Sequence, residues 1–163
     1  MKALIVYVSL HHQNTEKVAR EMAAAIGADC RHPDDVDRDS IASYDLIGLG
    51  SGIYFSSHHR DLLNFVNGLE KLLRHKRVFI FSTSGFEELV FHQALKERLE
   101  AHGAELVGEF KCGGWHTYGP FEMGGGLQQG RPDRIDLQNA ADFARDLVRA
   151  LESHEPSQAR KES

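Results

Sequence analysis

Residues 3–19, ALIVYVSLHHQNTEKVA, decide the fold of this 163-residue chain. Residues 3–8 are an apolar run without polar alternation, which predicts a β-strand buried on both faces of a parallel sheet. The polar loop 9–15 follows, and apolar residues then recur every four positions up to Gly27, a glycine typical of the residue after a helix. The stretch therefore predicts a strand, a polar loop and a helix, the unit from which open α/β sheets are built.

The rest of the chain repeats this alternation. Further strand-like apolar runs cover residues 45–50 (DLIGLG), 77–82 (RVFIFS) and 105–110 (ELVGEF), with a weaker run at 28–31. Apolar stripes with helical spacing cover residues 62–73, 95–99 and 137–151. Either Asp133 or Asp136 is placed to cap the last helix. We therefore predict an α/β fold, a doubly wound three-layer sandwich around a five-stranded parallel sheet.

Composition limits the class of protein. A chain of 163 residues with 41% hydrophobic residues suits one domain, which we expect over residues 1–152, with a polar tail over 153–163. No apolar run reaches the roughly 20 residues of a membrane span, so we expect a cytoplasmic protein without membrane insertion. The net charge of -5 without a basic stripe argues against nucleic acid as a partner. Two cysteines are too few for a disulfide framework.

Three polar loops are expected at one edge of the sheet, because the ligands of open parallel sheets bind outside the carboxyl ends of the strands. They are residues 9–15 (SLHHQNT), 51–59 (SGIYFSSHH) and 82–86 (STSGF). The first loop opens a helix, whose free N–H groups can bind phosphate. The second offers apolar residues that a flat ring can cover, and the third offers hydroxyl and N–H groups. Together they predict a slot with a phosphate at one end and a flat, partly apolar wall.

Rival phosphate motifs fail. The chain has no G-x-x-x-x-G-K-[ST] sequence, and the glycines of residues 48–52 lack the third glycine of a dinucleotide fingerprint, since position 53 is isoleucine. We expect these glycines to let a ring lie against the backbone instead.

The first loop resembles the flavodoxin phosphate loop, S-x-T-G-N-T-E, in which Asn14, Thr15 and Glu16 match directly. GSGIY (50–54) and FSTSG (81–85) resemble the second and third loops of the same family, and the resemblance covers roughly residues 1–150. It implies the flavodoxin-like strand order 2-1-3-4-5, FMN as the cofactor, and electron transfer to a redox partner protein or a small-molecule acceptor. The candidate FMN-binding residues are Ser9, His11, His12, Gln13, Asn14, Thr15, Ser51, Gly52, Ile53, Tyr54, Phe55, Ser82, Thr83, Ser84, Gly85 and Trp115.

The first loop also departs from the family pattern. It is one residue longer, His11 and His12 replace hydroxyl residues, and Gln13 stands where glycine is usual. At least one imidazole is expected to approach the phosphate, unless both rings face water or pack on the loop. Trp115 either stacks on the flavin or packs over the end of the sheet, within a long glycine-rich loop, residues 112–132.

No residue is required as a catalytic acid, base or nucleophile. An electron carrier or a module of a redox system is therefore favoured over an FMN-dependent reductase of quinones or other small acceptors. Two other interpretations stay open: a metal site built from the histidine pairs 11–12 and 58–59, for which no ligand spacing such as H-x-x-x-H is present, and a binding domain that has lost its flavin. The sequence does not indicate an oligomeric state.

Overall fold

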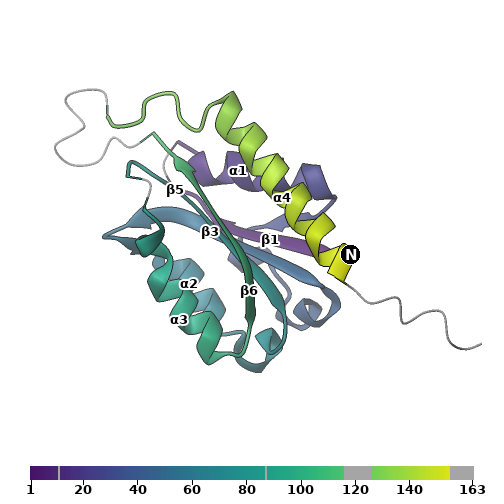
Figure 1. Cartoon of the computed structure of the whole chain (residues 1–163). Coiled ribbons are helices and arrows are strands. Elements are labelled where there is room, and N and C mark those ends of the chain that lie inside the picture. Colours follow the sequence, from purple (N-terminus) through teal and green to yellow (C-terminus); the bar gives the residue numbers. More distant parts are fainter. Residues whose placement is uncertain (11, 87, 116–125, 155–163) are drawn as a thin grey trace, which may run out of the picture.

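The computed structural model describes residues 1–10, 12–86, 88–115 and 126–154 of the chain (Figure 1). The strands are β1 (Ala3–Val8), β2 (Asp29–Arg31), β3 (Leu46–Tyr54), β4 (Ser57–His58), β5 (Arg77–Ser84) and β6 (Glu105–Gly113). The α-helices are α1 (Asn14–Ile26), α2 (Arg60–Asn67), α3 (Gln93–Ala101) and α4 (Arg134–His154). Short 3-10 helices are η1 (Pro33–Asp35), η2 (Arg38–Ser43), η3 (Glu70–Leu73) and η4 (Leu89–His92).

The main sheet has the predicted topology. Its parallel strands follow the order β2-β1-β3-β5-β6, and β4 adds a short antiparallel pairing to the end of β3. Helices α1 and α4 cover one face of this sheet, and α2 and α3 cover the other (Figure 1). Val8 pairs with Ser51, and Ser51 pairs with Ser82, so the loops that follow β1, β3 and β5 leave the sheet at the same edge.

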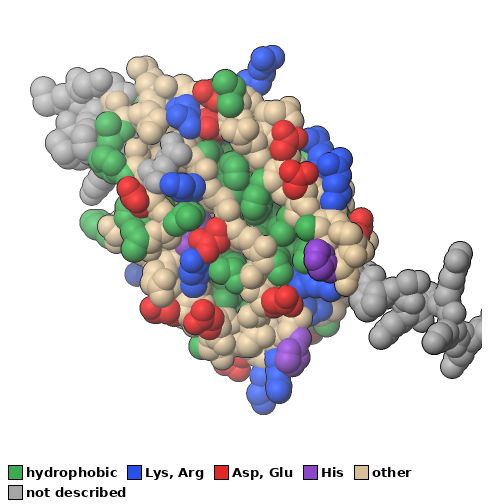
Figure 2. All heavy atoms as spheres, viewed as in Figure 1, with side chains coloured by type: hydrophobic (Ala, Val, Ile, Leu, Met, Phe, Trp, Pro, Cys, Tyr) green, Lys and Arg blue, Asp and Glu red, His purple; other side chains and the backbone are tan. Residues whose placement is uncertain are grey.

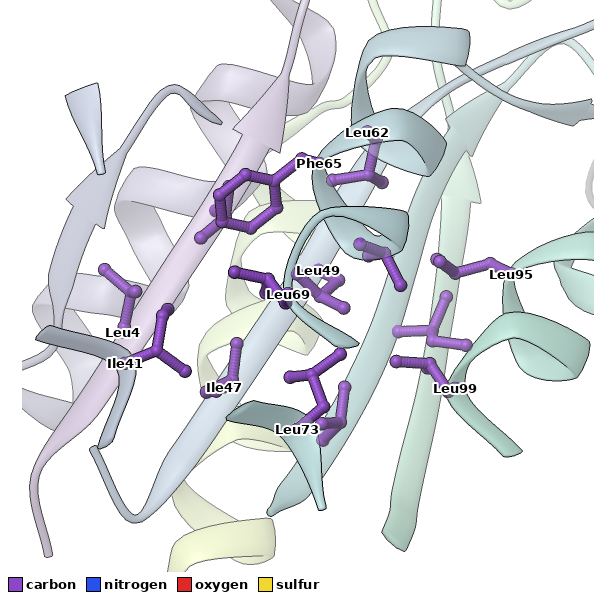
Figure 3. Close-up of a cluster of buried hydrophobic side chains, with 14 of the residues drawn as sticks. Leu4, Ile41, Ile47, Leu49, Leu62, Phe65, Leu69, Leu73, Leu95 and Leu99 are labelled. Atoms are coloured by element: carbon purple, nitrogen blue, oxygen red, sulfur yellow. The ribbon is translucent and has the colours of Figure 1, made fainter. Parts of the chain in front are cut away.

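Alternate residues of the central strands build a separate core on each face. On the α2/α3 face, Figure 3 shows Ile47 and Leu49 of β3 packed with Phe65 of α2 and Leu95 of α3, all buried. On the α1/α4 face, glycines make room for aromatic rings. A Cβ on Gly50 would lie 2.2 Å from the ring of Phe81, one of the phenyl groups of that core. The glycines of β3 therefore do admit rings against the backbone, and these rings belong to the protein's own core.

The ends of several elements differ from the expectation. Strands β3, β5 and β6 continue to Tyr54, Ser84 and Gly113, because polar residues past the apolar runs still pair in the sheet. The stripe over 62–73 divides into α2 and η3, since Gly68 ends the first helix.

The caps of the first and last helices match the predicted signals. Gly27 ends α1 with a left-handed φ of 64°. The cap of α4 is Asp133, whose carboxylate accepts from the N–H of Asp136 at 2.9 Å, while Asp136 accepts from the N–H of Asp133 and pairs with Arg131. In the described ranges, no helix combines the length and apolar character that crossing a membrane requires.

Candidate functional site

A cleft lies at the carboxyl edge of the sheet, the place where open parallel sheets bind their ligands. Its lining residues are Ser9, Leu10, Asn14, Thr15, Gly52, Ile53, Tyr54, Thr83, Ser84, Gly85, Gly114 and Trp115. The three predicted loops thus line one cleft together with the two residues that follow β6, Gly114 and Trp115. Within the described part of the chain, none of the lining side chains carries a formal charge.

The first loop enters α1 through two left-handed residues, His12 and Gln13, both at φ 54°. Gln13 therefore takes the conformation that glycine adopts most easily, at a cost of about 1–2 kcal/mol. Its side chain makes no capping hydrogen bond to α1. The N–H groups of the first helical turn are consequently available to an anion at the helix terminus.

Two buried polar atoms in the cleft fit a phosphate-bearing ligand. Ser9 Oγ and Asn14 Oδ1 have no hydrogen-bond partner within the described part of the chain, although both residues line the cleft. A buried polar group without a partner costs about 1–3 kcal/mol. The Ser9 hydroxyl can donate to a phosphate oxygen, and the Asn14 oxygen can accept from a ligand hydroxyl. A ligand with both groups, such as FMN, matches these two residues.

Other contacts of the first loop hold it to its neighbours. Thr15 Oγ1 lies 2.8 Å from Thr83 Oγ1, which ties the start of α1 to the third loop. Asn14 Nδ2 donates to the Trp115 carbonyl at 2.9 Å, so the Asn14 amide nitrogen is already used by the protein.

An apolar wall closes the opposite side of the cleft. Ile53 and Tyr54 line it, and the Tyr54 hydroxyl lies 2.9 Å from the position of a Cβ on Gly52. The backbone N–H of Leu10 donates to the Tyr54 oxygen, while burial raises the pKa of Tyr54. The phenol therefore spans the first and second loops. Phe55 stands outside this wall, with 96% of its surface exposed.

Trp115 lines the cleft and stacks on His12. The two ring centroids are 4.0 Å apart with an interplanar angle of 19°. The His12 ring does not line the cleft, and His11 lies outside the described residues. A phosphate contact of either histidine therefore stays a prediction, as does stacking of Trp115 on a flavin.

Ser51 and Ser82, two further candidates, turn away from the cleft. They are buried on the α2/α3 face, where Ser51 contacts His58 and Ser82 contacts His92. Because successive side chains of a strand point to opposite faces, the next residue of each strand reaches the cleft instead.

Sequence reasoning missed Leu10 and Gly114 as lining residues. Leu10 contributes through its backbone N–H, which residue type does not reveal. A Cβ on Gly114 would lie 3.0 Å from Asn14 Nδ2, so the glycine pair 113–114 at the end of β6 was the available signal for this close approach.

The metal site predicted from the histidine pairs can be examined only in part, because His11 lies outside the described residues. Among the residues with described positions, no group of three or more His, Cys, Asp or Glu side chains is arranged to hold a metal ion. His58 is buried, whereas its neighbour His59 caps α2 by accepting from the N–H of Asp61 at 3.1 Å. Adjacent histidines in this loop thus serve different structural contacts.

The fold and the cleft define a flavodoxin-type protein, and comparison with known proteins agrees. Residues 4–111 match the family described as Flavodoxin domain. Because this match covers more than half of the chain, the protein belongs to that family. An uncharacterized protein of Methanocaldococcus jannaschii is 46% identical over 151 residues, which cover 91% of this chain and 99% of the relative.

Solved structures show the same fold. Oxidised flavodoxin 2 from Bacillus cereus has a TM-score of 0.70 and 24% identity, with 92% of this chain and 99% of that chain covered. Two-electron reduced flavodoxin from Megasphaera elsdenii has a TM-score of 0.62 and 25% identity, with 88% and 98% covered. Rubredoxin oxygen:oxidoreductase from Desulfovibrio gigas has a TM-score of 0.68 and 18% identity; 93% of this chain aligns with 36% of that chain. The fold therefore occurs both alone and as part of a longer chain.

Proposed function

We propose that this protein binds FMN in the cleft and carries electrons, either as a separate carrier or as a flavodoxin-type module of a redox system. The observation that carries the proposal is the pair of buried, unpartnered oxygens, Ser9 Oγ and Asn14 Oδ1, beside the start of α1. Bound FMN would supply the redox chemistry, while the chain binds and orients it.

Each side of the cleft has a defined role in this proposal. The phosphate is held at the first loop by N–H groups of α1 and by the Ser9 hydroxyl. The ring lies between the Tyr54 side and the third loop, with Trp115 at the border of the cleft. FMN is favoured over FAD because the chain offers one phosphate loop and no second nucleotide motif.

A cofactor analysis tests this function. The protein is purified, its absorbance spectrum is recorded, and the released cofactor is identified by mass spectrometry. We expect FMN, and we expect protein stripped of flavin to quench FMN fluorescence on titration. Mostly FAD in the released fraction would contradict the choice of cofactor, and a folded protein that binds no flavin would leave a flavin-free binding domain.

A reductase of small apolar acceptors is the second candidate. Most of the exposed large apolar side chains in the described ranges belong to loops at this edge of the sheet: Leu10, Phe55, Phe86, Leu89 and Val90. Figure 2 shows hydrophobic side chains at the left margin of the molecule, where these loops lie. An apolar rim suits an acceptor such as a quinone, or the apolar face of a redox partner protein.

Kinetics separate the two candidates. A reductase should reduce a quinone with saturable steady-state kinetics, and Phe55→Ser should raise the KM without changing the spectrum of bound FMN. A carrier should react with quinone slowly and without saturation, and with a partner protein rapidly.

A further inference from the structure

Two buried histidines connect the second and third loops on the α2/α3 face of the sheet. Ser51 of β3 and Ser82 of β5 are register partners in the sheet. Ser51 Oγ lies 2.9 Å from His58 Nδ1, and Ser82 Oγ lies 2.8 Å from His92 Nε2. Each serine thus ties the far part of its loop back to the strand from which the loop begins.

The two imidazole rings meet in the interior. Their centroids are 5.0 Å apart, and His58 and His92 are only 2% and 0% exposed. His58 ends β4 and His92 ends η4, and these two elements contact each other. The ring contact, here called the histidine clasp, therefore joins one loop to the other.

Hydrogen bonds define the protons of His92. Its Nδ1 lies 3.0 Å from Glu109 Oε2, and the other carboxylate oxygen of Glu109 pairs with Lys96. An ionised carboxylate only accepts, so Nδ1 carries a hydrogen and the neutral ring accepts the Ser82 hydroxyl at Nε2. The order serine, histidine, glutamate is that of a hydrolytic triad. Ser82 is 2% exposed, however, so a substrate cannot reach its oxygen in this conformation.

His58 has no carboxylate partner. Ser51 Oγ donates to the Gly52 carbonyl and accepts from the His59 N–H, so His58 Nδ1 donates to Ser51. His58 Nε2 is buried and without a partner in the described structure. A proton added there would create a buried cation with no acceptor, next to a second imidazole.

The surroundings disfavour the charged form of both rings. Burial, and secondarily His92, lower the pKa of His58 to about 3. Burial also lowers the pKa of His92, against the opposing effect of Glu109. The charged groups around the clasp are Glu109 and Lys111 of β6 and Lys96 of α3, whereas β3 and β5 present neutral serines.

We propose that His58 and His92 are positioning residues for the flavin site: the clasp fixes the second loop against the third, and protonation of the clasp loosens both loops and weakens FMN binding. This inference rests on the proposed function of the cleft. Gly52 and Thr83, the residues after the two clasp serines, line the cleft directly. A displacement of either loop therefore changes the width of the slot.

Proton binding and cofactor binding oppose each other through the clasp. An imidazole freed from the interior has a pKa near 6.5, so an open clasp takes up a proton below about that pH, whereas the closed clasp does not. Because FMN needs the closed form, acid weakens its affinity, by up to about tenfold per pH unit for each ring that titrates. Because the pKa of His58 in the closed clasp is about 3, we expect the wild-type Kd to rise as the pH approaches that value, beyond the effect of the FMN phosphate, whose own pKa is near 6.

FMN titrations between about pH 3.5 and pH 8, followed by flavin fluorescence, test the clasp. Asparagine in His58→Asn keeps an N–H for Ser51 but cannot titrate, so the variant should bind FMN more weakly at neutral pH and lose the extra acid dependence. His59→Asn, one residue along the chain, is the matched control and should keep the wild-type pH profile. Ser51→Ala removes the anchor of His58 and should also weaken FMN; it serves as the second variant if His58→Asn does not fold.

The possible outcomes are distinguishable. FMN binding with the same pH profile in wild type and His58→Asn, or unchanged affinity in Ser51→Ala, overturns the clasp. A folded protein that binds no FMN at any pH overturns the proposed function instead. Imidazole and amide NMR signals then decide about the clasp without FMN: His58 should stay neutral well below its ordinary pKa, and the amides of both loops should shift together when it is protonated. Loops that respond independently would refute the clasp.

Discussion

Gln13 occupies a left-handed backbone position that favours glycine. Glycine removes the strain of the left-handed conformation in the folded protein, and it also increases the conformational entropy of the unfolded chain. The first effect should be larger, so we expect Gln13→Gly to raise the free energy of unfolding by about 1 kcal/mol. Urea unfolding of the flavin-free protein measures this change. The control Gln138→Gly, on the exposed face of α4, should lower stability by a similar amount. Equal losses in both variants would show that Gln13 is not strained.

A substitution of Ser9 should affect FMN binding without lowering the stability of the flavin-free protein. Its hydroxyl has no protein partner among the described residues, so Ser9→Ala should leave the flavin-free fold at least as stable as wild type. Loss of a hydrogen bond to a charged phosphate costs about 1.5–3 kcal/mol, which corresponds to roughly 10–150-fold weaker FMN binding. Fluorescence titration and urea unfolding measure the two effects, with the exposed Ser43→Ala as control. Unchanged FMN affinity in Ser9→Ala would show that the Ser9 hydroxyl does not bind the phosphate.

Individual residues also show why part of the site could not be predicted from the sequence. Asn14 and Thr15 are recognisable from the loop motif, but residue type does not reveal that the Asn14 amide is bound to the Trp115 carbonyl. Ser51 and Ser82 are predicted for the cofactor, yet the direction of a side chain depends on strand register. Because successive residues of a strand point to opposite faces, Ser51 and Ser82 direct their hydroxyls to the α2/α3 face and away from the cleft.

Among the elements, the strands and helices follow directly from apolar periodicity, because burial on both faces leaves a continuous apolar run. Their ends do not, since Ser51 and Thr83 continue the sheet through backbone pairing alone. The division of the 62–73 stripe was also unpredictable from periodicity, because η3 keeps the buried face of α2 across Gly68.

The contact between Gly50 of β3 and the Phe81 ring of β5 leads to a prediction about stability. A Cβ on Gly50 would lie 2.2 Å from the Phe81 ring, so Gly50→Ala should destabilise the protein by about 3 kcal/mol or more. Phe81→Leu makes space, and the double variant should be more stable than the sum of the two single losses predicts. A double-mutant cycle in urea measures this coupling. Additive losses would mean that the ring moves aside without cost.

For the molecule as a whole, acid should lower stability. The pKa of His58 is about 3 in the folded protein against an ordinary 6.5, so the unfolded chain binds a proton below pH 6.5 that the folded chain does not. The contribution of neutral His58 to the free energy of unfolding is therefore fully present above about pH 6.5, and it decreases by about 2 kcal/mol when the pH falls to about 5. Urea unfolding at both pH values should show the loss in wild type and a smaller one in His58→Asn. Equal losses would exclude His58 as the cause.

The overall charge should also govern the second reduction of the bound flavin. The chain carries a net charge of -5, and among the residues with described positions no charged side chain lines the cleft. A fully reduced anionic flavin would gain no compensating cation there, so we expect its midpoint potential to lie below that of free FMN. Spectroscopic redox titration measures it. A midpoint potential above that of free FMN would mean that a cation outside the lining residues stabilises the reduced flavin. Arg60, at the start of α2, would be the first residue to test, by the substitution Arg60→Gln.

The hydrogen bond between Asn14 and Trp115 joins residues 101 positions apart in the chain. During synthesis the first loop leaves the ribosome long before the end of β6, so its final geometry waits for almost three quarters of the polypeptide. Such distant contacts close slowly and only after the intervening sheet has formed. If the cleft binds FMN as proposed, binding is therefore a late step in the folding of this protein. A nascent chain that is truncated before Trp115 should then leave the ribosome unable to retain FMN.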